Sequence, residues 1–352
     1  MRLLTRLLRV GGVELGAGRP VRVQTMGNLP LTEVGANIAQ IEESAALGCE
    51  IFRLALPDGS LLPFFSEIIS HSPLPVIADI HFHPSLLRKA LEAGAAGARI
   101  NPGNVGSSTD WSETVRLFED LGAVMRIGVN GGSLDKEALK RHGHTAEALV
   151  ASAQEWSNRL YDLGFYRFKV SLKSSDVRTT VQAYRLFSRV SDIPLHIGLT
   201  EAGPLPEGLI KSSAALGTLL LEGIGDTLRI SLTAPPEEEV KAAWELLSSL
   251  NLRRRWPEVI SCPLCARSSY PFTELLPKLL PRIKALSLPV KVAFMGCEVN
   301  GPGEAREADI GLAFSKGKAF LFRKGEIVER GNPEPMVERL LQVLEEMARD
   351  NS

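Results

Sequence analysis

Three of the four cysteines in this chain of 352 residues lie near its C-terminal end. Cys262 and Cys265 form a Cys-x-x-Cys pair, Cys297 follows, and Glu304 closes a Gly-Pro-Gly turn after it. Thiolates are the ligands that suit zinc, copper(I) and iron–sulfur clusters. A carboxylate beside three thiolates would be a harder ligand, which could hold an iron loosely enough for it to meet a substrate oxygen. Spacing alone leaves an iron–sulfur cluster, a structural zinc site and a redox disulfide open.

The composition is that of a soluble enzyme rather than of a nucleic-acid or membrane protein. The formal net charge of −1 gives no general attraction to nucleic acid, so any anion site must be local. No run of about 18 apolar residues is present, and arginines interrupt the first ten residues where a signal peptide would be apolar. Four cysteines are too few for a disulfide framework. We therefore expect a cytoplasmic protein.

The first 250 residues alternate between short β-rich runs and helical patterns. The predicted strands are residues 21–26, 50–56, 76–80, 97–101, 123–130, 168–173, 195–200 and 228–233. Eight strand–helix units are typical of a closed (β/α)₈ TIM barrel, an α/β fold. An open doubly wound sheet is the alternative, but no Gly-x-Gly-x-x-Gly fingerprint follows the first strand. Residues 3–20 read as a β-hairpin ahead of the barrel.

The length of the chain suggests a second domain. Residues 253–257, which are basic and contain a proline, read as a linker. We predict a TIM-barrel substrate-binding domain over residues 1–251 and a small α/β domain that carries the cysteines over 252–352. In the latter, a strand is expected at 290–295, a hairpin at 318–323 and 326–329, and a terminal helix at 335–349.

Polar residues alternate with apolar ones along the predicted barrel strands. In residues 168–173, for example, Lys169, Ser171 and Lys173 alternate with apolar positions. Because side chains alternate across a strand, the polar set should face the barrel interior. The substrate-binding residues predicted in this way are Arg53, Asp79, Arg99, Asn101, Arg126, Asn130, Lys169, Lys173, His196, Arg229 and Ser231.

Such an interior is unusual, since barrel interiors are normally filled by branched apolar residues. A single arginine at a strand end is most often just the partner of an ion pair. Six cations on one face have too few acidic neighbours to balance them, and buried like charges are costly. Arginine and lysine are common phosphate ligands, so the pattern predicts a substrate with two phosphoryl groups.

Two further residues have positions that suggest a role. Glu201 follows the seventh strand at the catalytic end of the barrel and is a candidate acid or base. Cys49 lies at a helix-to-strand junction on the opposite end, where it reads as a small buried hydrophobe and not as a ligand.

Several motifs, taken together, resemble a known family. They include Val21-x-Val23-Gln24-Thr25-Met26, Arg99-Ile-Asn101-Pro-Gly-Asn104, Arg126-x-Gly128-Val-Asn130, Lys169-x-Ser171-x-Lys173, Leu199-Thr-Glu201-Ala-Gly203, Ser261-Cys-Pro-x-Cys and Met295-Gly-Cys297-x-Val-Asn300-Gly-Pro-Gly-Glu304. Over nearly the whole chain they resemble the bacterial 4-hydroxy-3-methylbut-2-enyl diphosphate synthases of the non-mevalonate isoprenoid pathway. Residues 27–31 depart from the Thr/Asn-rich stretch usual in that family, and the extra central domain of plant-type members is missing.

The resemblance implies a four-iron four-sulfur cluster held by Cys262, Cys265, Cys297 and Glu304. It also implies that 2-C-methyl-D-erythritol 2,4-cyclodiphosphate is opened reductively with loss of water. We predict catalytic roles for Glu201 and Glu304. Flavodoxin or ferredoxin would supply the electrons. We further expect a homodimer with shared active sites, because a linker as short as 253–257 spans at most about 20 Å.

Two other classes of function fit part of the pattern. One is a non-redox TIM-barrel enzyme acting on a phosphorylated sugar, with the cysteine domain as a zinc-stabilised lid; it would be colourless and active without a reductant. The other is a sensor that binds the diphosphate and reports the state of the cluster, without turnover. Neither explains a glutamate placed beside three cysteines.

Overall fold

The structure is a computed structural model that describes residues 3–80, 84–101, 110–134, 136–262, 270, 272–296 and 307–350. The chain forms two compact units, Met1–Leu246 and Leu247–Ser352. Each unit has its own sheet and its own hydrophobic core.

The first unit is a parallel β-barrel. Its strands are β3 (Arg22–Met26), β4 (Ile51–Ala55), β5 (Val76–Asp79), β6 (Gly97–Ile100), β7 (Val124–Asn130), β8 (Phe168–Lys173), β9 (His196–Ile197) and β10 (Thr227–Leu228). They form one sheet in the order β8-β7-β6-β5-β4-β3-β10-β9. A parallel bridge between Val170 and Leu195 joins the two ends of this sheet. The predicted TIM barrel is therefore confirmed.

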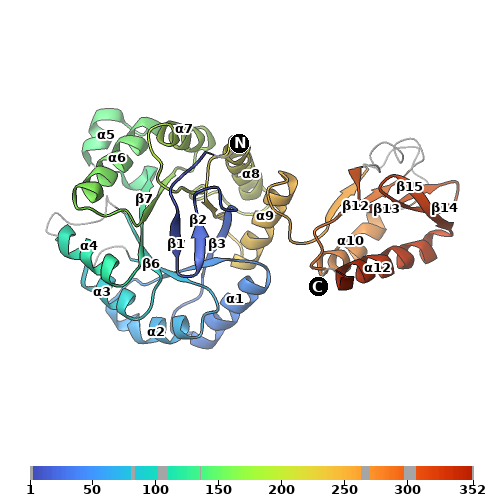
Figure 1. Cartoon of the computed structure of the whole chain (residues 1–352), viewed down its shortest axis with the longest axis horizontal. Helices are drawn as coiled ribbons and strands as arrows, with labels where there is room; N and C mark the ends of the chain where they lie inside the picture. Colours follow the sequence, from blue (N-terminus) through green and yellow to red (C-terminus); the bar gives the residue numbers. More distant parts are fainter. Residues whose placement is uncertain are drawn as a thin grey trace. The chain divides into compact units, whose positions relative to one another are not determined.

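Helices surround the strands as an outer ring (Figure 1). They are α1 (Val34–Ala46), α2 (Leu62–Ser70), α3 (Pro84–Glu92), α4 (Trp111–Asp120), α5 (Lys136–His142), α6 (Ala146–Asp162), α7 (Val177–Ser188), α8 (Glu207–Leu221) and α9 (Pro236–Ser249). The side chains of Asp110, Thr145 and Asp176 accept hydrogen bonds from the first-turn backbone N–H groups of α4, α6 and α7. These caps satisfy donors that a helix leaves open and fix where each helix begins.

A hairpin of β1 (Leu8–Val10) and β2 (Val13–Leu15) precedes the barrel, as predicted. Its side chains Leu8, Val10 and Leu15 form a buried cluster with residues at or near the starts of the barrel strands, Ile51, Ile77 and Val124. The hairpin therefore covers the N-terminal ends of the strands, and the opposite, C-terminal end is left for a ligand.

Strands β9 and β10 are shorter than the six residues predicted for each, and the prediction of their length was wrong. Between β8 and β9, the side chain of Tyr184 bonds to backbone groups that would otherwise pair directly. The hydroxyl of Tyr184 on α7 accepts a hydrogen bond from the N–H of Leu172 (3.1 Å) and donates to the carbonyl of His196 (2.6 Å). Tyr184 is fully buried. Its hydroxyl, which acts as both donor and acceptor, links the two strands where their backbones separate.

The second unit contains a five-stranded sheet. The strands β11 (Glu258–Ser261), β12 (Lys291–Met295) and β13 (Ile310–Ser315) are parallel, and β14 (Lys318–Arg323) and β15 (Glu326–Gly331) continue the sheet antiparallel. Among the described residues of this unit, the helices are α10 (Phe272–Lys284) and α12 (Pro333–Asp350). The predicted strand 290–295, the hairpin and the terminal helix are confirmed. Strands β11 and β13 and helix α10 were not predicted.

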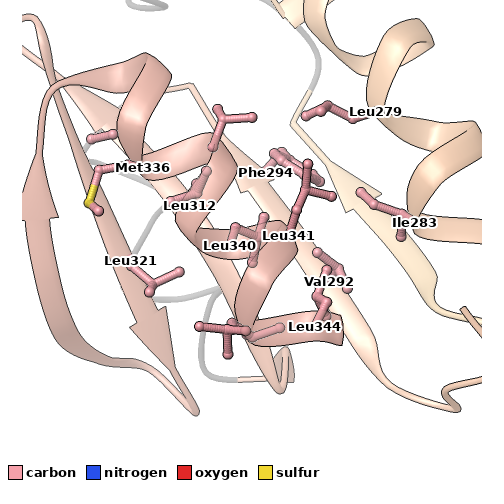
Figure 2. Close-up of a cluster of buried hydrophobic side chains, with 14 of the residues drawn as sticks. Leu279, Ile283, Val292, Phe294, Leu312, Leu321, Met336, Leu340, Leu341 and Leu344 are labelled. Atoms are coloured by element: carbon pink, nitrogen blue, oxygen red, sulfur yellow. The ribbon is translucent and has the colours of Figure 1, made fainter. Parts of the chain in front are cut away.

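A hydrophobic core lies between the sheet and helices α10 and α12 (Figure 2). Leu340, Leu341 and Leu344 of α12 pack toward sheet residues, and Leu279 and Ile283 of α10 complete the cluster. Each of these side chains is almost fully buried. Among the described residues, no helix is long and apolar enough to cross a membrane.

Candidate active site

Cations from neighbouring strands form one row across the inside of the barrel. The strand register pairs Asp79 with Arg99, Arg99 with Arg126, and Arg126 with Lys169. In a parallel sheet, paired residues share a face, so the four side chains lie side by side. Each is at most 4% exposed. The predicted polar interior is therefore present in this part of the barrel.

Asp79 is the acidic member of this row, and two arginines share it. Its carboxylate lies 3.6 Å from Arg53 Nε and 3.4 Å from Arg99 Nη1. Burial lowers the pKa of Arg53 to about 10, although the charge of Asp79 opposes that shift. One carboxylate between two guanidinium groups leaves an excess of positive charge around it.

Arg126 and Lys169 are buried cations, and some of their N–H groups have no hydrogen-bond acceptor among the described residues. Arg126 Nε and Nη1 and Lys169 Nζ have no hydrogen-bond partner among the described residues. Burial, together with neighbouring cations, holds the pKa of Arg126 well below its usual range and lowers that of Lys169 to about 7. Buried donors without acceptors are costly. Their presence indicates that an anionic ligand completes the site.

Lys173 and His196 meet in the same interior, with Lys173 nearer the C-terminal end of β8 than Lys169 is. Lys173 Nζ lies 3.4 Å from His196 Nε2, and His196 Nδ1 lies 2.8 Å from the hydroxyl of Thr227. Burial and nearby positive charge hold the pKa of both groups well below their usual ranges. A neutral imidazole whose Nε2 accepts from Lys173 carries its proton on Nδ1, where it donates to Thr227.

Two predicted amides lie at the ends of strands in this region. Asn101, directly after β6, is 2% exposed. Asn130 ends β7, and its amide satisfies both neighbours when its oxygen accepts from Arg99 Nη2 at 2.9 Å and its nitrogen donates to the carbonyl of Val129. Asn130 thus connects the cationic row to the mouth of the barrel.

A cavity of about 490 Å³ opens at the C-terminal ends of β7, β8 and β9. It is lined by Asn130, Gly131, Gly132, Leu134, His144, Thr145, Leu149, Ser174, Ser175, Thr179, Thr200 and Glu201. Glu201 is exposed and has a positive φ of 52°, a conformation that is unfavourable for a residue other than glycine. A strained acidic residue at the mouth of a barrel is a strong candidate for a catalytic role.

Arg229 and Ser231, after β10, are half-buried and already have partners within the protein. Arg229 Nε and Nη2 donate to the two carboxylate oxygens of Glu239, each at 2.8 Å. Ser231 Oγ donates to the carbonyl of Leu199 at 3.1 Å. Sequence reasoning missed Glu239, since three consecutive glutamates at the start of a helix read as a solvated first turn.

Cys262 is the one predicted cluster ligand within the described residues, and it directly follows β11. The backbone N–H of Gly296 donates to its Sγ at 3.1 Å. Gly296 directly follows β12, the parallel neighbour of β11, and immediately precedes Cys297 in the chain. Hydrogen bonds to the cysteine sulfurs are part of the surroundings of iron–sulfur clusters, so the position of Cys262 fits that of a cluster ligand.

The other three predicted ligands, Cys265, Cys297 and Glu304, lie outside the described residues. Within the described ranges, no group of three His, Cys, Asp or Glu side chains could hold a metal ion. Cys49 is 3% exposed, and burial raises the pKa of its thiol to about 12. Its interpretation as a buried hydrophobe is confirmed.

Two family descriptions match this chain. Residues 5–244 match the GcpE TIM-barrel domain, and residues 258–346 match the GcpE protein C-terminal domain. Together they cover most of both units.

Curated relatives match along nearly their whole length. A protein of Persephonella marina is 45% identical over 344 residues, 97% of this chain and 98% of its own. One of Geobacter sulfurreducens is 46% identical over 348 residues, 99% of each chain. Both are named 4-hydroxy-3-methylbut-2-en-1-yl diphosphate synthase (flavodoxin).

Among solved structures, the dihydropteroate synthase of Yersinia pestis is similar with a TM-score of 0.50 and 13% identity. The match covers 70% of this chain and 98% of that one. The dihydropteroate synthase of Stenotrophomonas maltophilia gives the same TM-score at 14% identity. At such low identity the likeness concerns the fold alone.

Proposed function

The chain belongs to the GcpE family, and from this membership we infer that it is a flavodoxin-dependent oxidoreductase. It converts 2-C-methyl-D-erythritol 2,4-cyclodiphosphate into 4-hydroxy-3-methylbut-2-enyl diphosphate, the product for which its relatives are named. The ring is opened reductively with loss of water, which takes two electrons. The observation in the structure that best supports this function is the row of buried cations with open donors.

We propose that Arg99, Arg126 and Lys169 bind the diphosphate. A phosphoryl oxygen would accept from Arg126 Nε or Nη1 and from Lys169 Nζ, the donors that lack partners within the described part of the protein. Arg53, Lys173 and Arg229 add positive charge around the same interior. Asp79, Asn101, Asn130, His196 and Ser231 would orient the cations and the hydroxyl groups of the substrate. Electrostatic interactions in so dry a site are strong and hold the ring in a fixed pose.

Glu201 is the residue that we propose as proton donor. It lies on the wall of the mouth cavity, beside the end of β9. The hydroxyl group lost as water must take up a proton, and a carboxyl group at that position can supply it. The strained backbone at Glu201 fixes where its side chain begins.

We propose that Cys262, Cys265, Cys297 and Glu304 hold a four-iron four-sulfur cluster. Such a cluster would supply the two electrons one at a time. The chemistry of Cys262 supports this assignment, because its sulfur accepts an N–H bond from the residue that precedes Cys297. Glu304, as a harder and more weakly held ligand than a thiolate, would leave one iron open to a substrate oxygen.

We also propose a homodimer in which the cysteine unit of one chain serves the barrel of the other. Within the barrel unit, α9 follows β10 and returns the chain from the mouth toward the opposite end, where the linker starts. A mixture of Arg126→Leu and Cys297→Ser proteins should then regain activity after subunit exchange. Exchange without any activity would argue for sites built within one chain.

The cytoplasm is the compartment that we propose for the enzyme, since the cluster ligands must be reduced thiolates. Flavodoxin is the donor named in its relatives, and ferredoxin is a second candidate of the same kind. Both are small acidic electron carriers.

The decisive experiment is anaerobic purification followed by analysis of bound iron, sulfide and zinc, and by a turnover assay with the cyclic diphosphate. We expect a brown protein with about four irons per chain and turnover that depends on reduced flavodoxin. Bound zinc in a colourless protein that turns over without reductant would favour the zinc-lid enzyme. A loaded cluster with substrate binding but no turnover with any donor would favour a sensor.

A further inference from the structure

Glu239 is a buried carboxylate that no predicted role accounts for. It lies on the first turn of α9 and is 3% exposed. Its two oxygens accept four hydrogen bonds. Arg229 donates two of them, the hydroxyl of Thr25 on β3 donates one at 2.7 Å, and the backbone N–H of Leu232 donates one at 3.0 Å. The carboxylate therefore connects α9 with β3 and with the chain after β10.

The pair with Arg229 has a fixed geometry. Two parallel N–H···O bonds of 2.8 Å, from Nε and Nη2, are the bidentate arrangement that orients a guanidinium plane most firmly. The side chain of Glu239 is 2% exposed and that of Arg229 is 17% exposed. Glu239 thus lies on the buried side of Arg229. The side of the guanidinium group that carries Nη1 does not contact Glu239 and forms the free edge of Arg229.

That free edge faces a second arginine across a sulfur atom. Arg229 Nη1 lies 3.7 Å from Met26 Sδ, and the same sulfur accepts from Arg53 Nε at 3.1 Å and Arg53 Nη2 at 2.8 Å. A thioether is a weak acceptor. Two guanidinium groups that converge on one weak acceptor are arranged for a stronger one, such as a phosphoryl oxygen.

We propose that Glu239 is a positioning residue that holds Arg229 so that its Nη1 edge, together with Arg53, binds a phosphoryl group of the substrate. This inference rests on the proposed function, because it takes the anion to be the diphosphate of the cyclic substrate. Glu239 itself does not touch the substrate. All four of its hydrogen bonds go to the protein, and its action passes through Arg229.

Two simpler roles for Glu239 make different predictions. If it only compensated charge, removing its charge would make the site more positive and would tighten anion binding. If it only braced Thr25 and Leu232, its removal would lower stability and leave the affinity for anions unchanged.

The test uses Glu239→Gln in the full chain, with Glu238→Gln as the matched control. Glu238 is the neighbouring residue on the same helix, and its side chain is 43% exposed and pairs with Lys241. Binding of inorganic diphosphate is measured by titration calorimetry, and KM and kcat are measured with the cyclic substrate and reduced flavodoxin. For Glu239→Gln we expect Kd and KM to rise about tenfold with kcat within threefold of wild type. Glu238→Gln should match wild type.

A double-mutant cycle separates positioning from a general effect. In an Arg229→Gln background, adding Glu239→Gln should change Kd by less than about twofold, because the residue through which it acts is gone. Multiplication of the two single effects would overturn the proposal, and so would an unchanged or lower Kd in Glu239→Gln.

Glu239→Asp covers the case in which Glu239→Gln fails to fold. It keeps the charge but shortens the side chain, so we expect an intermediate rise in Kd; wild-type Kd would overturn the positioning role. A wild-type protein that binds inorganic diphosphate but never turns over the cyclic substrate would count against the proposed function alone. In that case the change in Kd for inorganic diphosphate between wild type and Glu239→Gln would still test the role of Glu239.

Discussion

Gly128 on β7 and Arg99 on β6 fit against each other so closely that any side chain at residue 128 would displace the guanidinium group of Arg99. A Cβ atom at residue 128 would lie 2.7 Å from Arg99 Nε. Glycine weakens the interior of a strand, so its presence there calls for a reason. The reason is space for a buried guanidinium group between two strands that both carry cations.

Gly128→Ala should therefore displace Arg99 and weaken the binding of inorganic diphosphate about tenfold or more, since a displaced guanidinium no longer meets the anion. The atom that must move belongs to a side chain, so we expect the protein to fold. Titration calorimetry measures the effect. Gly35→Ala is the control, because a Cβ there would meet nothing within 4 Å and the position lies in helix α1. Equal affinities in the two variants would show that Arg99 lies outside the anion site.

Gly198→Ala should cost stability as well as affinity. A Cβ at residue 198 would lie 2.6 Å from Lys173 Nζ and 2.8 Å from the carbonyl oxygen of Arg229. The second contact is with backbone, which cannot move aside cheaply. We expect a loss of about 1–3 kcal/mol in the free energy of unfolding, measured by denaturant titration. Wild-type stability would mean that the barrel accommodates the methyl group.

The sequence was sufficient to predict the barrel and most of its polar lining. The alternation of Lys169, Ser171 and Lys173 along β8 reflects the pleat of a strand, which depends only on local geometry. The register that aligns Arg99, Arg126 and Lys169 follows once eight parallel strands close into a barrel.

What could not be predicted depends on contacts between residues far apart in the chain. Glu239 pairs with Arg229 and with Thr25, 214 residues away, and no local pattern signals such a pair. Tyr184 bonds to both β8 and β9 from the buried face of α7, where its ring reads as an ordinary core residue. Tyr184 bonds to backbone groups of Leu172 and His196, and Glu239 accepts from the backbone N–H of Leu232 beyond the end of β10. Side chains thus take up backbone groups in the region where strands β9 and β10 were predicted to be longer.

Lys169 should make the stability of the protein depend on pH. Burial and the charges of Arg126 and Arg53 lower its pKa from 10.5 to about 7 in the folded protein. Between these values the unfolded chain binds a proton that the folded chain does not, so stability rises with pH in this window. Relative to Lys169→Met, we expect the wild type to gain about 1 kcal/mol per pH unit between about pH 7 and 9. If denaturant titrations showed the same change of stability with pH in wild type and in Lys169→Met, the lowered pKa of Lys169 would be contradicted.

The same lysine should take up a proton when an anion binds. A diphosphate beside Lys169 favours its charged form, so binding above pH 7 draws a proton from the buffer. Calorimetry at pH 8 in buffers of different ionisation enthalpy measures this uptake. Wild type should take up close to one proton more than Lys169→Met. The ligand's own change in protonation is the same in both proteins and cancels in this comparison. No difference between the two would place the anion away from Lys169.

Glu201→Gly should stabilise the fold while abolishing activity. Glu201 has a φ of 52°, which glycine adopts without strain, so we expect a gain of about 1 kcal/mol in the free energy of unfolding. Turnover should fall at least a hundredfold if the carboxyl group is the proton donor. Ala17→Gly is the control, since Ala17 has a φ of 47° in a turn after β2. It should stabilise by a similar amount and keep full activity.

The cluster assignment separates two cysteines that each lie within two residues of a strand. Cys262→Ser should lose the cluster, because its sulfur lies at the C-terminal ends of the parallel strands β11 and β12 and accepts an N–H bond from Gly296. Cys49→Ser should keep it, since the thiol of Cys49 is buried, donates to the carbonyl of Ile51 at 3.2 Å, and has a pKa of about 12 that leaves no thiolate to bind iron.

Iron and sulfide content and visible absorption after anaerobic reconstitution give the readout, with thermal unfolding as a check that each variant is folded. Cys265→Ser and Cys297→Ser should behave as Cys262→Ser does. Glu304→Ala should destabilise the cluster, whereas Glu304→Cys should retain it with little turnover, because a fourth thiolate would close the position that we propose for the substrate. Near-normal turnover in Glu304→Gln would mean that this residue is no ligand. A full cluster in folded Cys262→Ser would mean that the cluster is not bound at the C-terminal end of β11.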